Sequence, residues 1–345
     1  MPARRSPAGG RAGAGPVPAG AGREPGRGRG RRAAGAAVRR SGRGAGPGGG
    51  RRRAGRGGRR PGPDRAPHRP RARRHPGGAD LLTSTDREVL PVTQQAPDPG
   101  LWFRRFHPAP AGDVRLVCFP HAGGSASFYF PVSKALSPRM EVLAVQYPGR
   151  QDRRSEAQLT DLHVLADRIA EALAPLTDRR LAFFGHSMGA MLAYEVGLRL
   201  EDAGRHDLTH VFASGRRAPS CYRGESVHQR DDEGILAELQ RMDGTDPRLL
   251  TDPELQRMFL PVIRGDYRAV ETYRHRPDAA LRSALTVLTG DSDAMTTVAE
   301  ARDWAAHTTG HFDLRVFPGG HFYLVPQAAA VLDLLSTTLA PLPTY

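Results

Sequence analysis

Ser187 has the clearest chemical setting in this chain. It is the central residue of Gly185-His-Ser-Met-Gly189, which matches the pattern G-x-S-x-G. In this pattern the serine occupies a sharp turn between a strand and a helix. A serine hydroxyl is a weak nucleophile, so it must be presented beside a base. The pattern therefore indicates that Ser187 is the nucleophile of an acyl-transfer enzyme, although an ordinary strand-to-helix turn can contain the same five residues.

The residues on both sides of Ser187 favour the catalytic interpretation. Residues 181–184 are all apolar, as in a strand that is buried on both faces of a sheet. Residues 188–200 carry apolar side chains at Leu192, Val196 and Leu200, which is the spacing of one helix face. The motif thus lies between a predicted strand and a predicted helix, as the turn requires.

A catalytic acid is predicted in the segment Leu285-Thr-Val-Leu-Thr-Gly-Asp-Ser-Asp293. In an α/β-hydrolase the acid comes after the serine and follows a late strand. Two aspartates meet this condition. We favour Asp293 because it lies three residues beyond Gly290, where the loop has turned toward the site. Asp291 is the alternative, and either aspartate could instead stabilise a turn or a helix N-terminus.

A catalytic base is predicted in the loop after the last strand. Residues 312–317 have the composition of a strand and are followed by Pro318-Gly-Gly-His321. The two glycines permit a tight turn that presents the histidine. Because the chain order Ser, Asp, His is that of an α/β-hydrolase, we predict His321 as the general base. His186, inside the serine motif, is expected to pack against the site or to tune it.

Two backbone N–H groups are needed to stabilise the oxyanion of the intermediate. One should belong to Met188, the residue after the nucleophile. The other should come from the loop after an early strand, and Phe119-Pro-His-Ala-Gly-Gly-Ser125 is such a loop. We predict Ala122 as this second donor. A phosphate-binding loop is the alternative, but no Gly-Lys-Ser or Gly-Lys-Thr follows, which disfavours it.

The elements that must position these residues alternate between strands and helices. Such alternation is typical of an α/β fold with a doubly wound, mostly parallel sheet. The predicted strands are residues 114–119, 141–146, 181–184, 210–213, 284–288 and 312–317. The predicted helices are residues 162–173, 188–200, 297–306 and 328–339. Residues 219–277 interrupt the alternation with a helical pattern, which predicts an inserted helical lid over the active site.

The first 97 residues differ sharply in composition from the rest. They carry 23 arginines and five acidic residues, a net charge of +18, whereas the remainder carries 27 basic and 31 acidic residues, a net charge of −4. Residues 1–79 contain no Leu, Ile, Phe, Tyr or Trp, so this segment cannot bury enough apolar surface to fold. We therefore predict a disordered tail over residues 1–97 and one globular domain over residues 98–345.

Three interpretations of the tail compete. It could bind nucleic acid, but it has no aromatic residue that could stack on bases. It could be a targeting segment, but no apolar stretch follows its arginines. We favour a translated upstream region with a natural start at Val89 or Val92, because no methionine lies between Met1 and Met140.

The composition points away from membrane proteins, disulfide-stabilised proteins and metalloproteins. No apolar run approaches the length of a membrane span. The two cysteines, Cys118 and Cys221, provide neither a disulfide framework nor a metal-ligand spacing. We expect a cytoplasmic monomer that needs no cofactor or metal.

Residues 101–339 resemble the type II thioesterases that accompany modular polyketide synthases and nonribosomal peptide synthetases. The resemblance covers the whole predicted globular domain and rests on eight motifs. These are Trp102-Phe-Arg-Arg-Phe-His107, Phe119-Pro-His-Ala-Gly-Gly124, Tyr147-Pro-Gly-Arg150, Gly185-His-Ser-Met-Gly-Ala190, Ala213-Ser-Gly-Arg-Arg-Ala-Pro219, Leu260-Pro-Val-Ile-Arg-Gly-Asp266, Gly290-Asp-Ser-Asp293 and Gly319-Gly-His-Phe322.

This resemblance implies an α/β-hydrolase with a helical lid, a triad of Ser187, Asp293 and His321, and an oxyanion hole formed by Ala122 and Met188. Members of the family act in trans and hydrolyse stalled or aberrant acyl groups from the phosphopantetheine arm of carrier proteins, while some release products. The implied activity is a free-standing editing thioesterase, and the implied partner is a loaded acyl or peptidyl carrier protein.

Other functions remain open on the sequence alone. A serine esterase that acts on small oxygen esters is the main alternative, because the serine motif is shared by both. A nucleic-acid-binding role of the basic tail is less favoured. Arg150, Arg216 and Arg217 could contact the acidic helices of a carrier protein, or they could be ordinary surface or structural residues.

Overall fold

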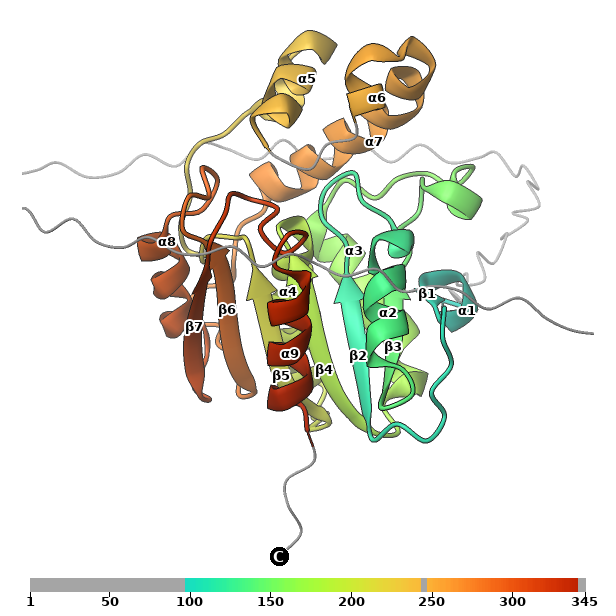
Figure 1. Cartoon of the computed structure of the whole chain (residues 1–345), viewed down its shortest axis with the longest axis vertical. Coiled ribbons are helices and arrows are strands. Elements are labelled where there is room, and N and C mark those ends of the chain that lie inside the picture. Colours follow the sequence, from blue (N-terminus) through green and yellow to red (C-terminus); the bar gives the residue numbers. More distant parts are fainter. Residues whose placement is uncertain (1–96, 243–246, 341–345) are drawn as a thin grey trace, which may run out of the picture. The chain divides into compact units, whose positions relative to one another are not determined.

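The computed structural model describes residues 97–242 and 247–340 (Figure 1). All of them belong to one compact unit within Asp86–Tyr345. The predictions for residues 1–96, namely a disordered tail and its three interpretations, lie outside the described residues.

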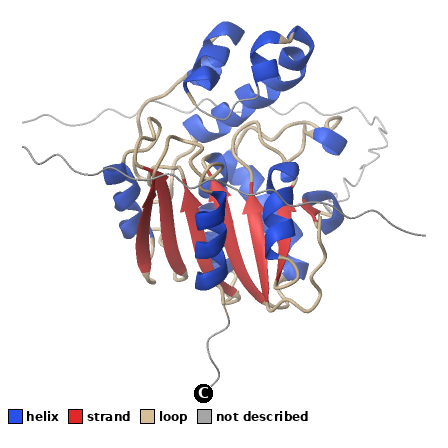
Figure 2. Ribbon diagram, viewed as in Figure 1, coloured by secondary structure: helices blue, strands red, loops and turns tan. Residues whose placement is uncertain are grey.

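A seven-stranded sheet organises the described residues, in the order β1-β3-β2-β4-β5-β6-β7 (Figure 2). The strands are β1 (Phe103–Arg104), β2 (Val114–Phe119), β3 (Met140–Val145), β4 (Arg180–His186), β5 (Leu208–Ser214), β6 (Ala284–Gly290) and β7 (Phe312–Phe317). Only β1 is antiparallel to its neighbour in this sheet. The predicted α/β-hydrolase fold with a mostly parallel sheet is confirmed, and all six predicted strands are present.

The central strands are buried on both faces, which explains their mainly apolar sequences. Every residue of β2 and of β3 is buried. Alternate residues of β2 enter different clusters: Val117 and Phe119 pack on one side of the sheet, whereas Leu116 and Cys118 pack on the other. A strand with a core on each side favours apolar residues on both faces. The two charged residues of these strands, Arg115 and Glu141, are buried as an ion pair (2.6 Å). Cys118 is accordingly a buried core residue.

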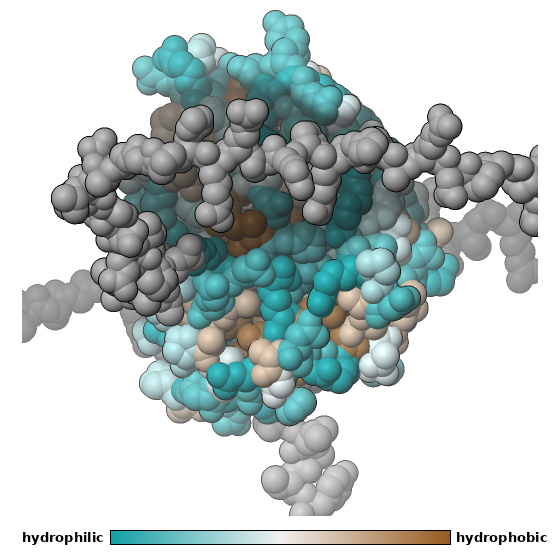
Figure 3. Space-filling view, turned by 180° about the vertical axis from the view of Figure 1, so that it is seen from behind, coloured by the Kyte–Doolittle hydropathy of each residue, from teal (hydrophilic) through white to brown (hydrophobic). Residues whose placement is uncertain are grey.

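Helices cover both faces of this sheet, with α2 and α9 on one face and α3 and α4 on the other (Figure 1). Their bounds are α1 (Pro99–Trp102), α2 (Phe130–Leu136), α3 (Leu162–Leu173), α4 (Met188–Asp202), α8 (Val298–Arg302) and α9 (Ala328–Thr338). Seen from behind, the molecule has a mainly hydrophilic surface (Figure 3). None of the helices described here has the length and apolar character needed to cross a bilayer.

Some helices differ from the sequence predictions. The helix predicted over residues 297–306 ends at Arg302, and the 3-10 segment Asp303–His307 follows it. Helix α2 was not predicted, because it spans only seven residues and begins with Phe130-Pro131. Short elements with a proline at their start resemble turns in sequence.

The chain between β5 and β6 forms a helical insertion beyond the carboxyl ends of the strands (Figure 1). It contains α5 (Asp232–Arg241), α6 (Pro247–Thr251) and α7 (Pro253–Thr272). Its apolar side chains form a cluster separate from the two cores beside the sheet, made of Val227, Ile235, Leu239, Leu260, Ile263 and Tyr267. The helical lid predicted from the sequence is thus present, and it covers the edge of the sheet where parallel strands end.

Candidate active site

Ser187 occupies the sharp turn between β4 and α4. Its backbone angles are φ 55° and ψ −115°, which residues other than glycine rarely adopt. Its N–H donates to the Ser214 carbonyl of the neighbouring strand β5 (2.8 Å). A Cβ on Gly185 would lie 2.0 Å from the Gly189 carbonyl oxygen, and one on Gly189 would lie 2.0 Å from the Phe119 carbonyl oxygen. Both glycines are therefore required for the turn to close.

His321 and Asp293 form a buried hydrogen-bonded pair. Asp293 lies in the loop after β6, and His321 lies in the loop after β7. His321 Nδ1 is 3.0 Å from Asp293 Oδ2 and 3.1 Å from Oδ1. Asp293 Oδ1 also accepts the N–H groups of Met295 (2.7 Å) and Thr296 (3.2 Å). These bonds fix the carboxylate in an orientation that holds the imidazole ring.

Asp291 supports the same site in a different way. Its Oδ1 accepts the N–H of Gly319 (3.0 Å), two residues before His321. Its own N–H donates to the Phe317 carbonyl (2.9 Å), and the Ser292 N–H donates to the Gly319 carbonyl (3.1 Å). Three hydrogen bonds thus join the loop after β6 to the end of β7 and the loop that follows it. Asp291 shapes the loop that carries the histidine, whereas Asp293 contacts the imidazole itself.

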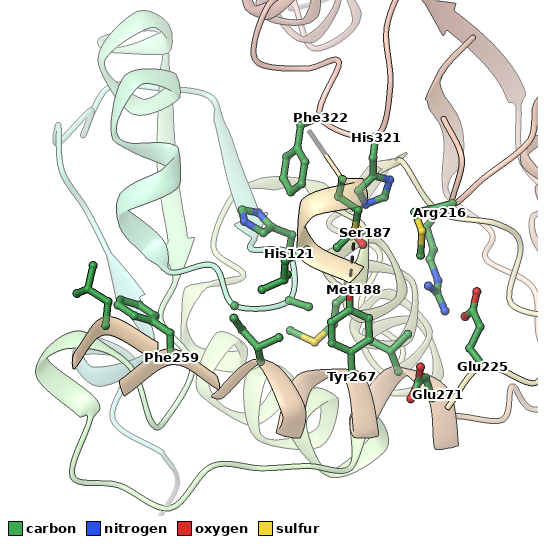
Figure 4. A pocket seen from close by; sticks show the side chains of 18 of the residues that line it. His121, Ser187, Met188, Arg216, Glu225, Phe259, Tyr267, Glu271, His321 and Phe322 are labelled. Carbon is green, nitrogen blue, oxygen red and sulfur yellow. Dashed lines mark hydrogen bonds between the residues drawn. The ribbon is translucent and has the colours of Figure 1, made fainter. Parts of the chain in front are cut away.

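Ser187 and His321 lie next to each other in the wall of one cavity (Figure 4). Because Asp293 engages Nδ1, the other ring nitrogen, Nε2, is left for the serine hydroxyl. The structure thus brings together Ser187, Asp293 and His321, which come from three loops at the carboxyl ends of β4, β6 and β7.

Two further histidines, His121 and His186, surround His321 as neutral rings. Burial lowers the pKa of His121 to about 3, and the charge of His321 contributes to this shift. Burial and His321 also lower the pKa of His186 well below its usual value. The His186 ring lies 4.9 Å from the His321 ring, and its Nδ1 is 3.0 Å from Ser214 Oγ. His186 therefore packs against the site, which is one of the two roles predicted for it.

The loop after β2 forms another part of the cavity wall. Ala122 from this loop and Met188 from α4 line the cavity beside Ser187. The hydroxyls of two buried tyrosines hold the loop in place by donating to its carbonyls. These contacts are Tyr129 Oη to Phe119 O (2.8 Å) and Tyr147 Oη to Pro120 O (3.0 Å). The backbone donors predicted for the oxyanion hole thus belong to a rigid surface next to the serine.

Asp266, on lid helix α7, connects this loop to the lid. Its Oδ2 accepts the Gly123 N–H (2.7 Å) and also pairs with the Arg150 guanidinium. Its Oδ1 accepts a hydrogen bond from Gln158 Nε2 (2.9 Å). The side chains of Asp266 and Arg150 are only 2% and 4% exposed. Removing one partner of such a pair is costly, because the other is left as a buried, unpaired charge.

Two of the arginines suggested as carrier-protein contacts are buried. Arg150 is held by Asp266, and Arg217 pairs with Glu225 while its own side chain is 4% exposed. The suggestion of a surface contact is therefore wrong for both. Arg216 lines the cavity instead. Arginines in loops are usually exposed, and nothing in the adjacent sequence marks these as buried.

The cavity beside Ser187 has a volume of about 350 Å³ and lies beneath the lid (Figure 4). Most of its wall is apolar and comes from the lid, through Leu239, Met242, Leu255, Phe259, Ile263 and Val270. Four charged residues also line it, namely Arg216, Glu225, Arg248 and Glu271. The space suits a short acyl chain whose carbonyl carbon lies at Ser187.

Sequence reasoning did not single out Asp266, Glu225 or Glu271 as functional residues. All three lie in the segment predicted as the lid. Asp266 and Glu271 contact residues far away in the sequence, whereas Glu225 pairs with Arg217, eight residues before it. The one available signal was that Asp266 ends the motif Leu260-Pro-Val-Ile-Arg-Gly-Asp266, which belongs to the family resemblance. Local sequence gives no indication of its partners.

Comparisons with known proteins all identify thioesterases. The family model described as Thioesterase domain matches residues 114–339. The "Probable cadicidin biosynthesis thioesterase" of Streptomyces griseus is 56% identical over 255 residues, which cover 74% of this chain and 70% of that protein. Thioesterase PikA5 of Streptomyces venezuelae is 52% identical over 245 residues, covering 70% of this chain and 86% of that protein. The solved structure of the type II thioesterase BorB from the borrelidin biosynthetic cluster has a TM-score of 0.65 and 49% identity, and covers 70% of this chain and 98% of that one.

Proposed function

The chain belongs to the thioesterase family, and from this premise we propose that it removes acyl groups from carrier proteins through Ser187, His321 and Asp293. It is an enzyme of the α/β-hydrolase fold that hydrolyses thioesters. Its relatives include type II thioesterases from the borrelidin biosynthetic cluster and from the yersiniabactin NRPS/PKS biosynthetic pathway. These relatives support an assembly-line carrier as the partner of this chain, with the enzyme acting in trans.

One observation carries the assignment of the catalytic residues. His321 Nδ1 is hydrogen-bonded to Asp293 at 3.0 Å, while His321 and Ser187 line the same apolar cavity. A serine, a histidine and an oriented carboxylate are the parts of an acyl-transfer triad. The cavity supplies the acyl-binding space that such a triad needs.

The first half of the reaction forms an acyl-enzyme. His321 Nε2 takes the proton from the Ser187 hydroxyl as its oxygen attacks the thioester carbonyl carbon. The N–H groups of Ala122 and Met188 stabilise the negative charge on the carbonyl oxygen. The carbon–sulfur bond then breaks, and His321 returns the proton to the departing thiol of the phosphopantetheine arm.

The second half releases the acyl group as an acid. His321 removes a proton from a water molecule, whose oxygen attacks the ester carbonyl at Ser187. The same two N–H groups stabilise the second oxyanion. Collapse of this intermediate returns the proton to the Ser187 oxygen. Asp293 stabilises the positive charge that His321 carries in both halves.

The arrangement of lid and cavity suggests how a loaded carrier would bind. The acyl chain would occupy the apolar cavity, and the phosphopantetheine arm would pass beneath the lid to bring its thioester to Ser187. The carrier itself would remain outside the lid. We also propose a cytoplasmic monomer, because the carrier proteins of assembly lines act inside the cell and the reaction uses one chain.

Intact mass spectrometry of acyl-loaded carrier protein tests this function directly. Acetyl- and propionyl-loaded carrier would be incubated with the full chain and, separately, with Ser187→Ala. The acyl mass should disappear with the wild type only. If the loaded carrier is unchanged while p-nitrophenyl esters are hydrolysed, the protein is an esterase on small oxygen esters and the carrier-protein proposal is wrong.

A further inference from the structure

Arg216 places a positively charged side chain in the wall of a mainly apolar cavity. It lies two residues after Ser214, whose carbonyl accepts the N–H of Ser187, so its backbone is close to the nucleophile. The Arg216 carbonyl accepts a hydrogen bond from Nε1 of the fully buried Trp304 (2.7 Å). The side chain extends from beside Ser187 toward Glu225 (Figure 4). Its backbone is thus fixed while its guanidinium lines the acyl-binding space.

The hydrogen-bonding capacity of Arg216 is incompletely used. Its Nε is buried and has no hydrogen-bond partner among the residues that the structure describes. The two nearby carboxylates are engaged elsewhere: Glu225 pairs with Arg217, and Glu271 accepts the N–H groups of Val227 and His228. A buried donor without a partner destabilises the protein, and more so when it is charged.

The charge of Arg216 persists at neutral pH. Burial lowers the pKa of its guanidinium, and the neighbouring Arg217 adds to this effect, but the pKa stays at about 10. A charged donor therefore faces the cavity under working conditions. Most of the other lining residues are apolar, and the second lining arginine, Arg248, belongs to lid helix α6. A bound acyl chain that carries an oxygen atom on the side of the loop after β5 would therefore find a charged donor in Arg216.

We propose that Arg216 and Glu225 form a polar subsite for a neutral oxygen substituent, a hydroxyl or keto group, on the acyl chain. Arg216 can donate a hydrogen bond to either group, and a hydroxyl can in addition donate to a Glu225 carboxylate oxygen. A carboxylate on the acyl chain is disfavoured, because Glu225 and Glu271 border the same part of the cavity and repel it. The inference rests on the proposed thioester hydrolysis and defines which acyl groups it favours.

The subsite should produce selectivity for oxygenated acyl groups. A site built to hydrogen-bond an oxygen discriminates strongly against the analogue that lacks it, since its buried polar group is then left unpaired. A hydrogen bond to a charged donor corresponds to a factor of about 10 or more in kcat/KM. The wild type should therefore prefer an oxygenated acyl thioester to its plain alkyl counterpart by about tenfold.

A matched set of N-acetylcysteamine thioesters tests the subsite in the full chain. The acyl groups are hexanoyl, 3-hydroxyhexanoyl, 3-oxohexanoyl, 5-hydroxyhexanoyl and the carboxylated hexanedioyl, and thiol release gives kcat/KM for each. Arg216→Met should remove the preference for oxygenated groups over hexanoyl, and Arg216→Lys should keep part of it. Arg223→Met, which removes a partly exposed pair with Glu300 outside the cavity lining, is the matched control and should leave the ratios unchanged. Ratios within one variant are independent of the fraction of folded enzyme.

The possible results separate this inference from the proposed function. A wild type without any preference, or an Arg216→Met variant that loses the same factor on every thioester, would show that Arg216 has a structural role only. If the wild type prefers hexanedioyl and Arg216→Met loses this preference, the subsite binds a carboxylate. That result would overturn the assignment to a neutral oxygen substituent. If the wild type hydrolyses none of the thioesters, the proposed thioesterase function itself fails.

Discussion

The carboxylate of Asp266 in lid helix α7 accepts the backbone N–H of Gly123 at 2.7 Å, one residue after Ala122. These residues are 143 positions apart in the sequence, so this contact joins the lid directly to the loop beside the nucleophile. The same carboxylate oxygen pairs with Arg150, which is buried. The position of the proposed oxyanion donor therefore depends on a residue of the lid.

Replacing Asp266 with Asn should lower kcat for thioester hydrolysis by about 10- to 100-fold, with a smaller change in KM. The amide can still accept from Gly123, but it cannot neutralise Arg150, so the loop and the lid helix lose their common anchor. Steady-state kinetics with an acyl thioester measure the effect. Asp232→Asn is the control, because it removes an exposed ion pair with Arg264, which lies on α7 as Asp266 does. Its kcat should stay within about twofold of the wild-type value. An unchanged kcat in Asp266→Asn would disprove the link.

Asp293→Asn should reduce kcat by about four orders of magnitude, because the amide favours the wrong tautomer of His321 and cannot stabilise its positive charge. Asp291→Asn should reduce kcat by less than about tenfold, since Asp291 only supports the Gly319 N–H. Single-turnover kinetics of the two variants decide between the aspartates. A larger loss in Asp291→Asn would mean that the acid is assigned to the wrong residue.

Gly189→Ala should destabilise the fold and abolish activity. Its Cβ would lie 2.0 Å from the Phe119 carbonyl oxygen, so two backbone segments would have to separate at the serine turn. Gly197→Ala, in the same helix, meets only the ends of side chains, chiefly Leu281 (2.9 Å) and Leu208 (3.1 Å), and gains helix propensity. Its free energy of unfolding should therefore fall by less than about 2 kcal/mol. Urea unfolding of both variants is the measurement. Equal stability of the two would contradict the close approach at Gly189.

The free energy of unfolding should fall as the pH falls from about 6.5 toward 3. Over this range the unfolded chain protonates a histidine with a pKa near 6.5, whereas folded His121, with a pKa of about 3, stays neutral. At pH 5 this single group removes about 2 kcal/mol relative to pH 7.5. Urea unfolding at pH 7.5 and at pH 5 gives the loss in the free energy of unfolding for each variant. This loss should be about 2 kcal/mol smaller in His121→Phe than in the wild type. The exposed His206, replaced by Gln, serves as the control, and an equal loss in His121→Phe and wild type would refute the prediction.

The fold could be predicted from the sequence because its signals are local. Buried strands such as β2 appear as mainly apolar segments, and each candidate catalytic residue follows such a segment within a short loop. Boundaries were less accurate where a strand extends past its apolar part. β5, for example, begins at Leu208 and includes the half-buried Thr209, whereas the apolar run predicted a start at residue 210.

The contacts of the lid could not be predicted, because they join residues that are far apart in sequence. Asp266 and Arg150 are separated by 116 positions, and each has the surroundings of an ordinary surface residue in the sequence. The choice between Asp291 and Asp293 was similarly open, since both follow β6 by a few residues. Only the three-dimensional arrangement shows that one contacts the imidazole and the other the loop that carries it.

The hydrogen bonds around the loops after β6 and β7 also limit how this chain can be recombined with a relative. A chimaera whose aspartate loop lacks a carboxylate at position 291 would lose the contact with the Gly319 N–H. The triad would then be complete in sequence but misaligned in space. Residues 290–297 and 318–322 of this chain should therefore be exchanged together.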